Sequence, residues 1–211
     1  MFAPDILDDN GTYVLLLGSG DREKPLSTFT AAAAVQNRFY MIQDKPTVAT
    51  WLSAENATCG SDVICENSLF AITGSATPTA SELAAKKGWY LNLASSEQVV
   101  TSAITVFNTV TFSTHRPTPP AAGTCSSLGT ATVYNLNFRN AATRVGTVRG
   151  ETIVGGGLSP SPVAGKVLLD NGQIVPFIIG ASPVSALQGG DPIAGGVAVR
   201  PKSRIYWNIK K

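Results

Sequence analysis

Short segments in which apolar and polar residues alternate recur along this chain of 211 residues. Around position 110, for example, Val110 and Phe112 share one phase of the alternation, and Thr109 and Thr111 share the other. A period of two is the pattern of a β-strand with one buried face. The 20 Gly and 13 Pro residues punctuate these segments as tight turns do. The pattern predicts an all-β fold with little helix, built from about ten to twelve short strands.

Two hairpins follow from the alternation. Residues 100–113 contain two alternating segments that meet at a turn near Asn108. Residues 167–175 contain the pair Asn171-Gly172 between two apolar segments. Asparagine followed by glycine supplies the two positive-φ positions of a type I′ turn, so we expect a tight two-residue turn there.

Other segments have a less regular pattern. The apolar runs 13–17 and 38–42 are typical of strands that are buried on both faces. A helix is predicted with force only at residues 81–87, where Ser81 can serve as the N-cap and Gly88 follows as a stop. Helix is therefore a minor part of the expected fold.

Composition and charge exclude several classes of protein. A 44% hydrophobic and 14% charged composition argues against a disordered chain. The net charge of +2 is small and the 16 Lys and Arg residues are scattered, so no nucleic-acid groove is expected. No apolar run approaches the roughly 18 residues of a membrane span. Residues 1–5 also lack the pattern of a signal peptide, so we expect the chain to be cut from a longer precursor.

The three cysteines are informative through their positions. Cys59 and Cys65 flank five residues that a disulfide can close into a loop, and we expect this bridge over two free thiols. The pair is a poor metal site because zinc prefers four ligands and no further Cys or His is close in sequence. Cys125 is left over, either free or paired with a cysteine outside the chain.

A catalytic site is not expected. His115 is the only histidine, and a Ser-His-Asp triad would need it together with Ser113 or Ser126. No Gly-x-Ser-x-Gly turn is present, and the following Pro-rich loop is a poor base for a precise site. We therefore interpret His115 as an exposed loop residue and the chain as a protein that is not an enzyme.

The segment Gly18-Ser19-Gly20-Asp21-Arg22 resembles a phosphate-binding loop only superficially. It lacks the Gly-Lys-Ser/Thr ending of such loops, and no convincing helix follows it. A tight turn is the better interpretation, with Asp21 accepting backbone amides. Arg22 is then free to pair with Glu23 or Asp44.

The three tryptophans are candidates for a sugar or peptide groove. Trp89 and Trp207 lie in expected strands, so core packing is the better explanation for both. Trp51 lies in a loop-like stretch and is the better candidate for an exposed ring.

Several segments, taken in order, resemble one known family. They are residues 17–26, 37–44, 88–93, 97–101, 110–126 and 204–209. The residues that carry the match most clearly are Gly18, Gly20, Asp21, Arg22, Arg38, Tyr40, Asp44, Trp89 and Trp207. Together these segments are similar to the C-terminal β-propeller of the PilC/PilY pilus-tip adhesins, and the terminal one resembles that family's closing strand.

The resemblance implies a fold and a function. It implies that residues 1–211 form a single β-rich domain, the C-terminal portion of a propeller with several four-stranded antiparallel blades. It also implies a type IV pilus biogenesis and cell-adhesion factor that supports pilus extension and surface attachment. Such a protein is found at the pilus tip, the outer membrane surface or the periplasm of a Gram-negative bacterium. Its partners would be minor pilins, the rest of its own precursor, and a host or abiotic surface.

Two departures from the family limit what it implies. The family's Asp-rich calcium loop has no match, because residues 8–11 offer too few spaced oxygen ligands and Asp170 belongs to the expected hairpin turn. No cofactor is therefore expected. At about 40–45 residues per blade the chain is also too short for a complete propeller. The alternative function is a secreted carbohydrate-binding module or hydrolase, which would need clustered carboxylates in a cleft.

Overall fold

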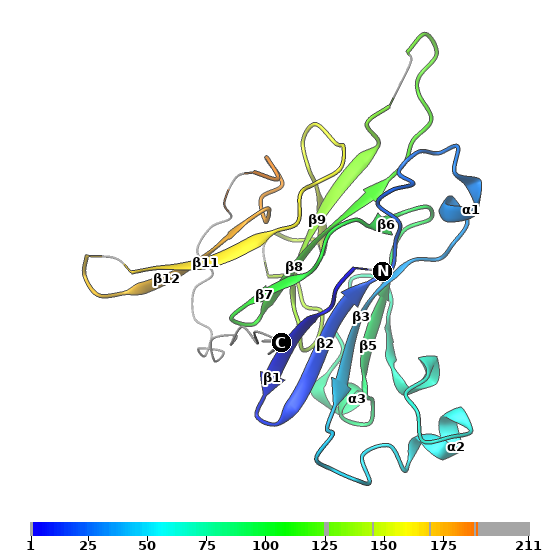
Figure 1. Ribbon diagram of the computed structural model, residues 1–211, viewed down its shortest axis with the longest axis vertical. Coiled ribbons are helices and arrows are strands. Elements are labelled where there is room, and N and C mark those ends of the chain that lie inside the picture. The colour runs from blue at the N-terminus through cyan, green and yellow to red at the C-terminus, as the bar shows by residue number, and fades with distance from the viewer. Residues whose placement is uncertain (1, 125–126, 145, 169, 188, 190–211) are drawn as a thin grey trace, which may run out of the picture.

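The computed structural model describes residues 2–124, 127–144, 146–168, 170–187 and 189. Trp207, Cys125 and Ser126 lie outside these described residues. Strands dominate the described part, and its helices are short (Figure 1). The expectation of an all-β fold with little helix is thereby confirmed.

The first sheet, called sheet A, has five strands. Their order is β1 (Asp5–Asp9), β2 (Thr12–Gly18), β3 (Arg38–Asp44), β5 (Gly88–Asn92) and β4 (Phe70–Ile72). The pairs are antiparallel except that β4 runs parallel to β5. β1 and β2 meet at Asn10 and Gly11, whose φ values of 55° and 82° are those of a type I′ turn.

The second sheet, called sheet B, also has five strands. They are β10 (Gly150–Thr152), β9 (Thr130–Asn137), β8 (Thr109–Arg116) and β6 (Gln98–Val99) in order, with β7 (Ile104–Val106) also paired to β8. The hairpin expected near Asn108 is confirmed as β7–β8. The expected half-burial of its second strand is wrong, since β8 is buried on both faces up to His115. Residues from outside the sheet contact its polar side: Thr101 accepts the backbone N–H of Ser113, and Asn135, which accepts the Thr111 hydroxyl, donates to the carbonyl of Ala181.

The third sheet is a separate hairpin of β11 (Val163–Leu168) and β12 (Ile174–Ile179), which projects from the body of the molecule (Figure 1). The expected type I′ turn at Asn171-Gly172 is wrong. Only Gly172 has a positive φ, of 79°, and the pairing closes at Leu168 and Ile174. The connection is therefore longer than the two residues of a type I′ turn.

The helices are α1 (Thr30–Ala33), α2 (Glu55–Cys59) and α3 (Ala80–Ala84), with one 3₁₀ turn at Glu66–Ser68. Ser81 was expected to be the N-cap of α3, but the N-cap is Thr79, two residues earlier. The Thr79 hydroxyl accepts the N–H of Glu82. The Glu82 side chain in turn accepts the N–H of Thr79, which completes a capping box. None of the helices in the described ranges is long and apolar enough to cross a membrane.

The core lies between sheets A and B. The rings of Phe39 in β3 and Phe112 in β8 stack with centroids 3.8 Å apart. Trp89 in β5 is fully buried and donates its indole N–H to the carbonyl of Phe138 at 3.0 Å. Two sheets thus pack face to face around aromatic side chains. The described residues form neither a closed barrel nor a closed propeller, and the two large sheets have five strands where four-stranded blades were expected.

Candidate docking surface

Sheet A is apolar on both of its faces. In β2, Val14 and Leu16 point to the core and are buried, while Tyr13, Leu15 and Leu17 alternate with them and point to the opposite side. Tyr13 is 42% exposed, and Leu15 and Leu17 are half-buried. Residues 13–17 were expected to be buried on both faces, and this expectation is wrong: one face of β2 is buried and the other is partly exposed.

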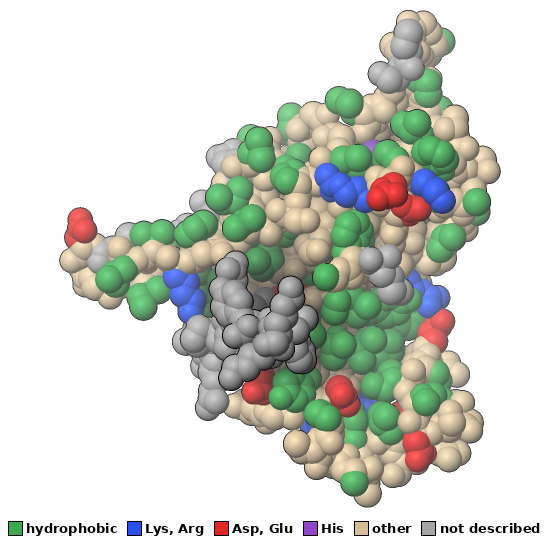
Figure 2. Space-filling view, in the orientation of Figure 1, with side chains coloured by type: hydrophobic (Ala, Val, Ile, Leu, Met, Phe, Trp, Pro, Cys, Tyr) green, Lys and Arg blue, Asp and Glu red, His purple; other side chains and the backbone are tan. Residues whose placement is uncertain are grey.

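Strand register extends this second apolar face across the sheet. Leu15 is opposite Ile6 in β1 and Ile42 in β3, and Leu17 is opposite Tyr40. We call the following set the outer face of sheet A: Ile6, Tyr13, Leu15, Leu17, Tyr40, Ile42 and Tyr90. Figure 2 shows hydrophobic side chains gathered over β2 and β3. An antiparallel sheet with one solvated face normally carries polar residues there, so this face has the composition of a packing surface.

Charged groups lie at both ends of the outer face. Asp8 and Asp44 flank Tyr13 at one end. At the other end Arg38 pairs with Glu66 at 2.7 Å, and its guanidinium lies 4.5 Å from the centroid of the Tyr90 ring. The hydrogen bond to Glu66 raises the pKa of Arg38, and the same bond lowers the pKa of Glu66. Arg38 is thus held in place as a fixed positive charge.

The segment from Gly18 to Arg22 connects sheet A to sheet B. The N–H of Val99 in β6 donates to the carbonyl of Ser19 at 3.0 Å. Gly18 and Gly20 both lie against Val99, so closely that a Cβ on either glycine would overlap it. Gly20 lies against the backbone of Val99 and Gly18 lies against its branched side chain, so neither position has room for a larger residue.

Asp21 and Arg22 complete this connection. The backbone N–H of Asp21 donates to the Gln98 side chain at 2.8 Å, and the Asp21 carboxylate accepts the N–H of Glu23 at 3.1 Å. The expected pairing of Arg22 with Glu23 or Asp44 is wrong. Its guanidinium donates instead to the carbonyls of Val100 and Ser159, at 2.7 and 2.6 Å. The segment lies against β6, and the Arg22 guanidinium reaches these two backbone oxygens from there.

Trp51 lies beside a cleft of about 320 Å³. Asp44, Lys45 and Asp62 contribute charged groups to the cleft lining. The ammonium groups of Lys45 and Lys87 are 4.7 and 3.7 Å from the centroid of the Trp51 ring. The ring already engages two cations, so it is not an empty platform for a sugar.

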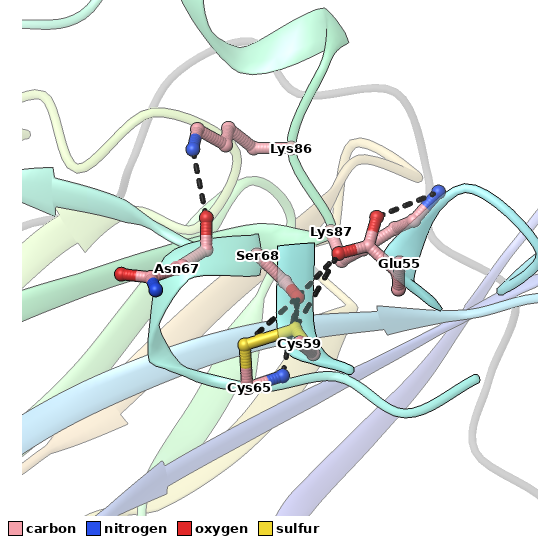
Figure 3. Close-up of a disulfide and its surroundings, with 7 residues drawn as sticks. All are labelled: Glu55, Cys59, Cys65, Asn67, Ser68, Lys86 and Lys87. Carbon is pink, nitrogen blue, oxygen red and sulfur yellow. Dashed lines mark hydrogen bonds and ion pairs between the residues drawn. A yellow bond between two sulfur atoms is a disulfide. The ribbon is translucent and has the colours of Figure 1, made fainter. Parts of the chain in front are cut away.

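Cys59 and Cys65 form a disulfide that joins the end of α2 to the 3₁₀ turn (Figure 3). The hydroxyl of Ser68 lies 3.1 Å from the sulfur of Cys59 and donates to the buried carboxylate of Glu55. The ammonium of Lys87 approaches the same carboxylate at 3.6 Å. The bridge therefore closes the loop beside a buried ion pair.

Removing this disulfide is expected to lower the free energy of unfolding by about 2 kcal/mol, because a short closed loop restricts the unfolded chain only modestly. The double variant Cys59→Ala/Cys65→Ala, compared with the parent by urea unfolding, measures the effect. Cys125→Ala leaves the bridge intact and is the control. Free reaction of Cys59 and Cys65 with an alkylating agent in the native protein would contradict the bridge.

His115 is not an exposed loop residue, and that interpretation is corrected. It lies in β8 opposite Gln98 and Ala131, and only 3% of it is exposed. Its Nε2 donates to the carbonyl of Leu128 at 2.9 Å. Burial arises because β8 continues to Arg116, one residue before the Pro-rich loop.

Glu97 is a second buried polar group, and the sequence analysis did not single it out. Its carboxylate accepts hydrogen bonds from the hydroxyls of Thr114 and Tyr134. Burial together with the nearby carboxylate raises the pKa of Tyr134 well above its usual value. In the described ranges, no group of three or more His, Cys, Asp or Glu side chains is placed to hold a metal ion.

The described residues that carry the family resemblance lie in three places. Tyr40 lies on the outer face of sheet A with Arg38 and Asp44 at its ends, Trp89 lies in the core, and the segment from Gly18 to Arg22 joins the sheets. Ile6, Leu15 and Ile42 were missed as surface residues. The run 13–17 is apolar in both phases of the alternation, which indicated a second apolar face in this strand but not that this face is exposed.

Comparisons with known proteins find little similarity. No protein family and no curated protein matches this sequence. Among solved structures, the crystal structure of the Pseudomonas aeruginosa PilY1 C-terminal domain is similar, with a TM-score of 0.49 and 14% identity. The match covers 83% of this chain and 42% of that domain, so the chain spans less than half the length of its structural neighbour.

Proposed function

We propose that this chain is a docking module of the type IV pilus machinery that takes part in pilus biogenesis and adhesion and is not an enzyme. Residues 1–211 would form the C-terminal portion of a propeller-like domain outside the cytoplasm. The observation that carries the proposal is the outer face of sheet A, which is apolar and only partly covered. A further sheet, from the same precursor or from a minor pilin, would stack on this face as sheet B stacks on the other.

Two other observations support the proposal. Among the described residues that resemble the PilC/PilY family, 37–44 and 88–93 contribute strands to sheet A, and 97–101 and 110–116 contribute strands to sheet B. Residues 17–26 include the connection between the two sheets. The disulfide is typical of proteins in an oxidising compartment such as the periplasm or cell surface. A carbohydrate-binding role is less favoured, since the Trp51 ring already engages Lys45 and Lys87.

Replacing Leu15 by glutamate in the full precursor is expected to abolish surface pili, because a carboxylate cannot be buried between two sheets without a partner. The purified 211-residue chain should lose only about 1 kcal/mol of stability, since Leu15 is half-buried. Val154→Glu is the matched control, because Val154 is 75% exposed and lies outside this face.

Pili counted by electron microscopy, and urea unfolding of each purified chain, are the two measurements. Normal piliation with Leu15→Glu would contradict the proposal, as would equal loss of pili with Val154→Glu. A photo-crosslinking residue placed at Tyr13 would show whether the covering sheet belongs to the precursor or to a pilin.

A further inference from the structure

The hairpin of β11 and β12 has one open edge. Its ladder runs unbroken through the pair of Lys166 and Pro176. Proline has no N–H, so this pair must be one of the non-hydrogen-bonded pairs of the ladder, whose backbone groups point outward. The N–H groups of Lys166 and, two residues on, Leu168 therefore point away from β12. Within the described residues, neither N–H has a backbone acceptor outside the β11–β12 ladder.

β12 offers a poorer edge than β11. Pro176 removes the outward donor in the middle of the strand. Gly189 already forms a bridge with Ile179 at the end of the strand. A strand that is added to the hairpin would therefore pair with β11.

One face of the hairpin carries no charged or polar side chain. It is formed by Val163, Gly165, Val167, Val175, Phe177 and Ile179. Val163 is 58% exposed and Val167 is 46% exposed. The Phe177 ring lies so close over Gly165 that a Cβ there would overlap the ring. The opposite face carries Lys166 as its one charged residue within the two strands.

We infer that β11 is a strand-addition site for an extended segment of a partner protein. Ala164 and Ile178 on the opposite face of the hairpin pack against β7, so the hairpin is anchored to the body of the molecule. In the described part of the chain no third strand pairs with β11, and an open apolar edge favours pairing with another strand. The partner strand would place apolar side chains at alternate positions beside Val163 and Val167. Its other face would place an acidic residue beside Lys166, because opposite charges stabilise a cross-strand pair.

Charge favours a different protein over a second copy of the chain as the partner. If two copies paired through β11, both Lys166 side chains would lie on one face of a short ladder, where like charges repel. Gly189 bridges to the edge of β12, on the opposite side of the hairpin from the open edge of β11. This surface is separate from the outer face of sheet A, and the inference does not depend on the proposed function.

A labelled peptide of alternating valine and threonine with a central glutamate is the probe. Its binding to the whole chain can be measured by fluorescence anisotropy, and hydrogen exchange should show new protection at the N–H groups of Lys166 and Leu168. Lys166→Glu should weaken binding of this peptide, because two acidic residues would then be opposite each other. The same variant should bind more tightly to a second peptide in which lysine replaces the central glutamate. Each dissociation constant is expected to change by about fivefold.

Lys166→Pro and Lys166→Thr form a matched pair. Proline removes the outward N–H without removing a ladder bond, so binding should be lost, whereas threonine keeps the N–H and should lose only the preference for glutamate. Equal binding by the two variants would overturn the inference. Protection of the Lys166 N–H without peptide would also overturn it. Sedimentation would then show a dimer if a second copy covers β11, and a monomer if the chain covers its own edge.

Discussion

Replacing Trp89 by alanine is expected to lower the free energy of unfolding by about 3–5 kcal/mol. The side chain is fully buried between the two large sheets, so its removal leaves a cavity in the core. It also removes the hydrogen bond from the indole to the carbonyl of Phe138, which links sheet A to the end of β9. Urea unfolding followed by circular dichroism measures the loss.

Trp89→Phe separates the two contributions, because it keeps most of the apolar area and loses the hydrogen bond. We expect its stability to lie between those of the parent and the alanine variant. Tyr13→Ala is the control in the same sheet, since Tyr13 is 42% exposed on the outer face and should cost less than about 1 kcal/mol. An unchanged urea midpoint for Trp89→Ala would refute the packing of the two sheets described above.

Replacing Glu55 by alanine is expected to cost about 3 kcal/mol, because it leaves the Lys87 ammonium buried without its carboxylate. The two side chains are only 8% and 12% exposed, and their charged atoms are 3.6 Å apart. The Trp51 ring, 3.7 Å from the same ammonium, offsets part of the loss. Thermal and urea unfolding of the purified chain measure the effect.

The double variant Glu55→Leu/Lys87→Met tests this explanation. Removing both charges should destabilise the protein less than Glu55→Ala alone, since no uncompensated charge is then buried. The single variants Glu55→Leu and Lys87→Met complete the comparison. If the double variant loses as much stability as these two single variants together, the two side chains are not coupled. The Asp21–Lys24 pair is a suitable control, because both side chains are exposed and Lys24→Ala should change stability little.

Turn geometry was only partly predictable from the sequence. The dipeptide Asn-Gly occurs at Asn10-Gly11 and again at Asn171-Gly172. The first closes a type I′ turn between β1 and β2, where Asp9 pairs with Thr12. The second does not, because β11 and β12 pair only up to Leu168 and Ile174. The register of the flanking strands selects the turn, and register depends on side-chain packing across the whole hairpin.

The burial of His115 was not predictable from its neighbours. Local sequence places it beside a proline-rich loop, but pairing with β6 and β9 on its two sides brings it inside the protein. The outer face of sheet A illustrates the same limit. Its residues come from β1, β2, β3 and β5, and only the register of these strands brings them onto one surface.

The sequence by itself determined the class of fold and the positions of many strands, because period-two alternation and turn residues act over a few neighbouring positions. The sequence also showed that two of the cysteines are close enough along the chain to form a bridge. The tertiary structure decided which strands pair, including the parallel pair of β4 and β5, and which faces remain uncovered. These depend on contacts between residues far apart in the chain, and no local pattern encodes such contacts.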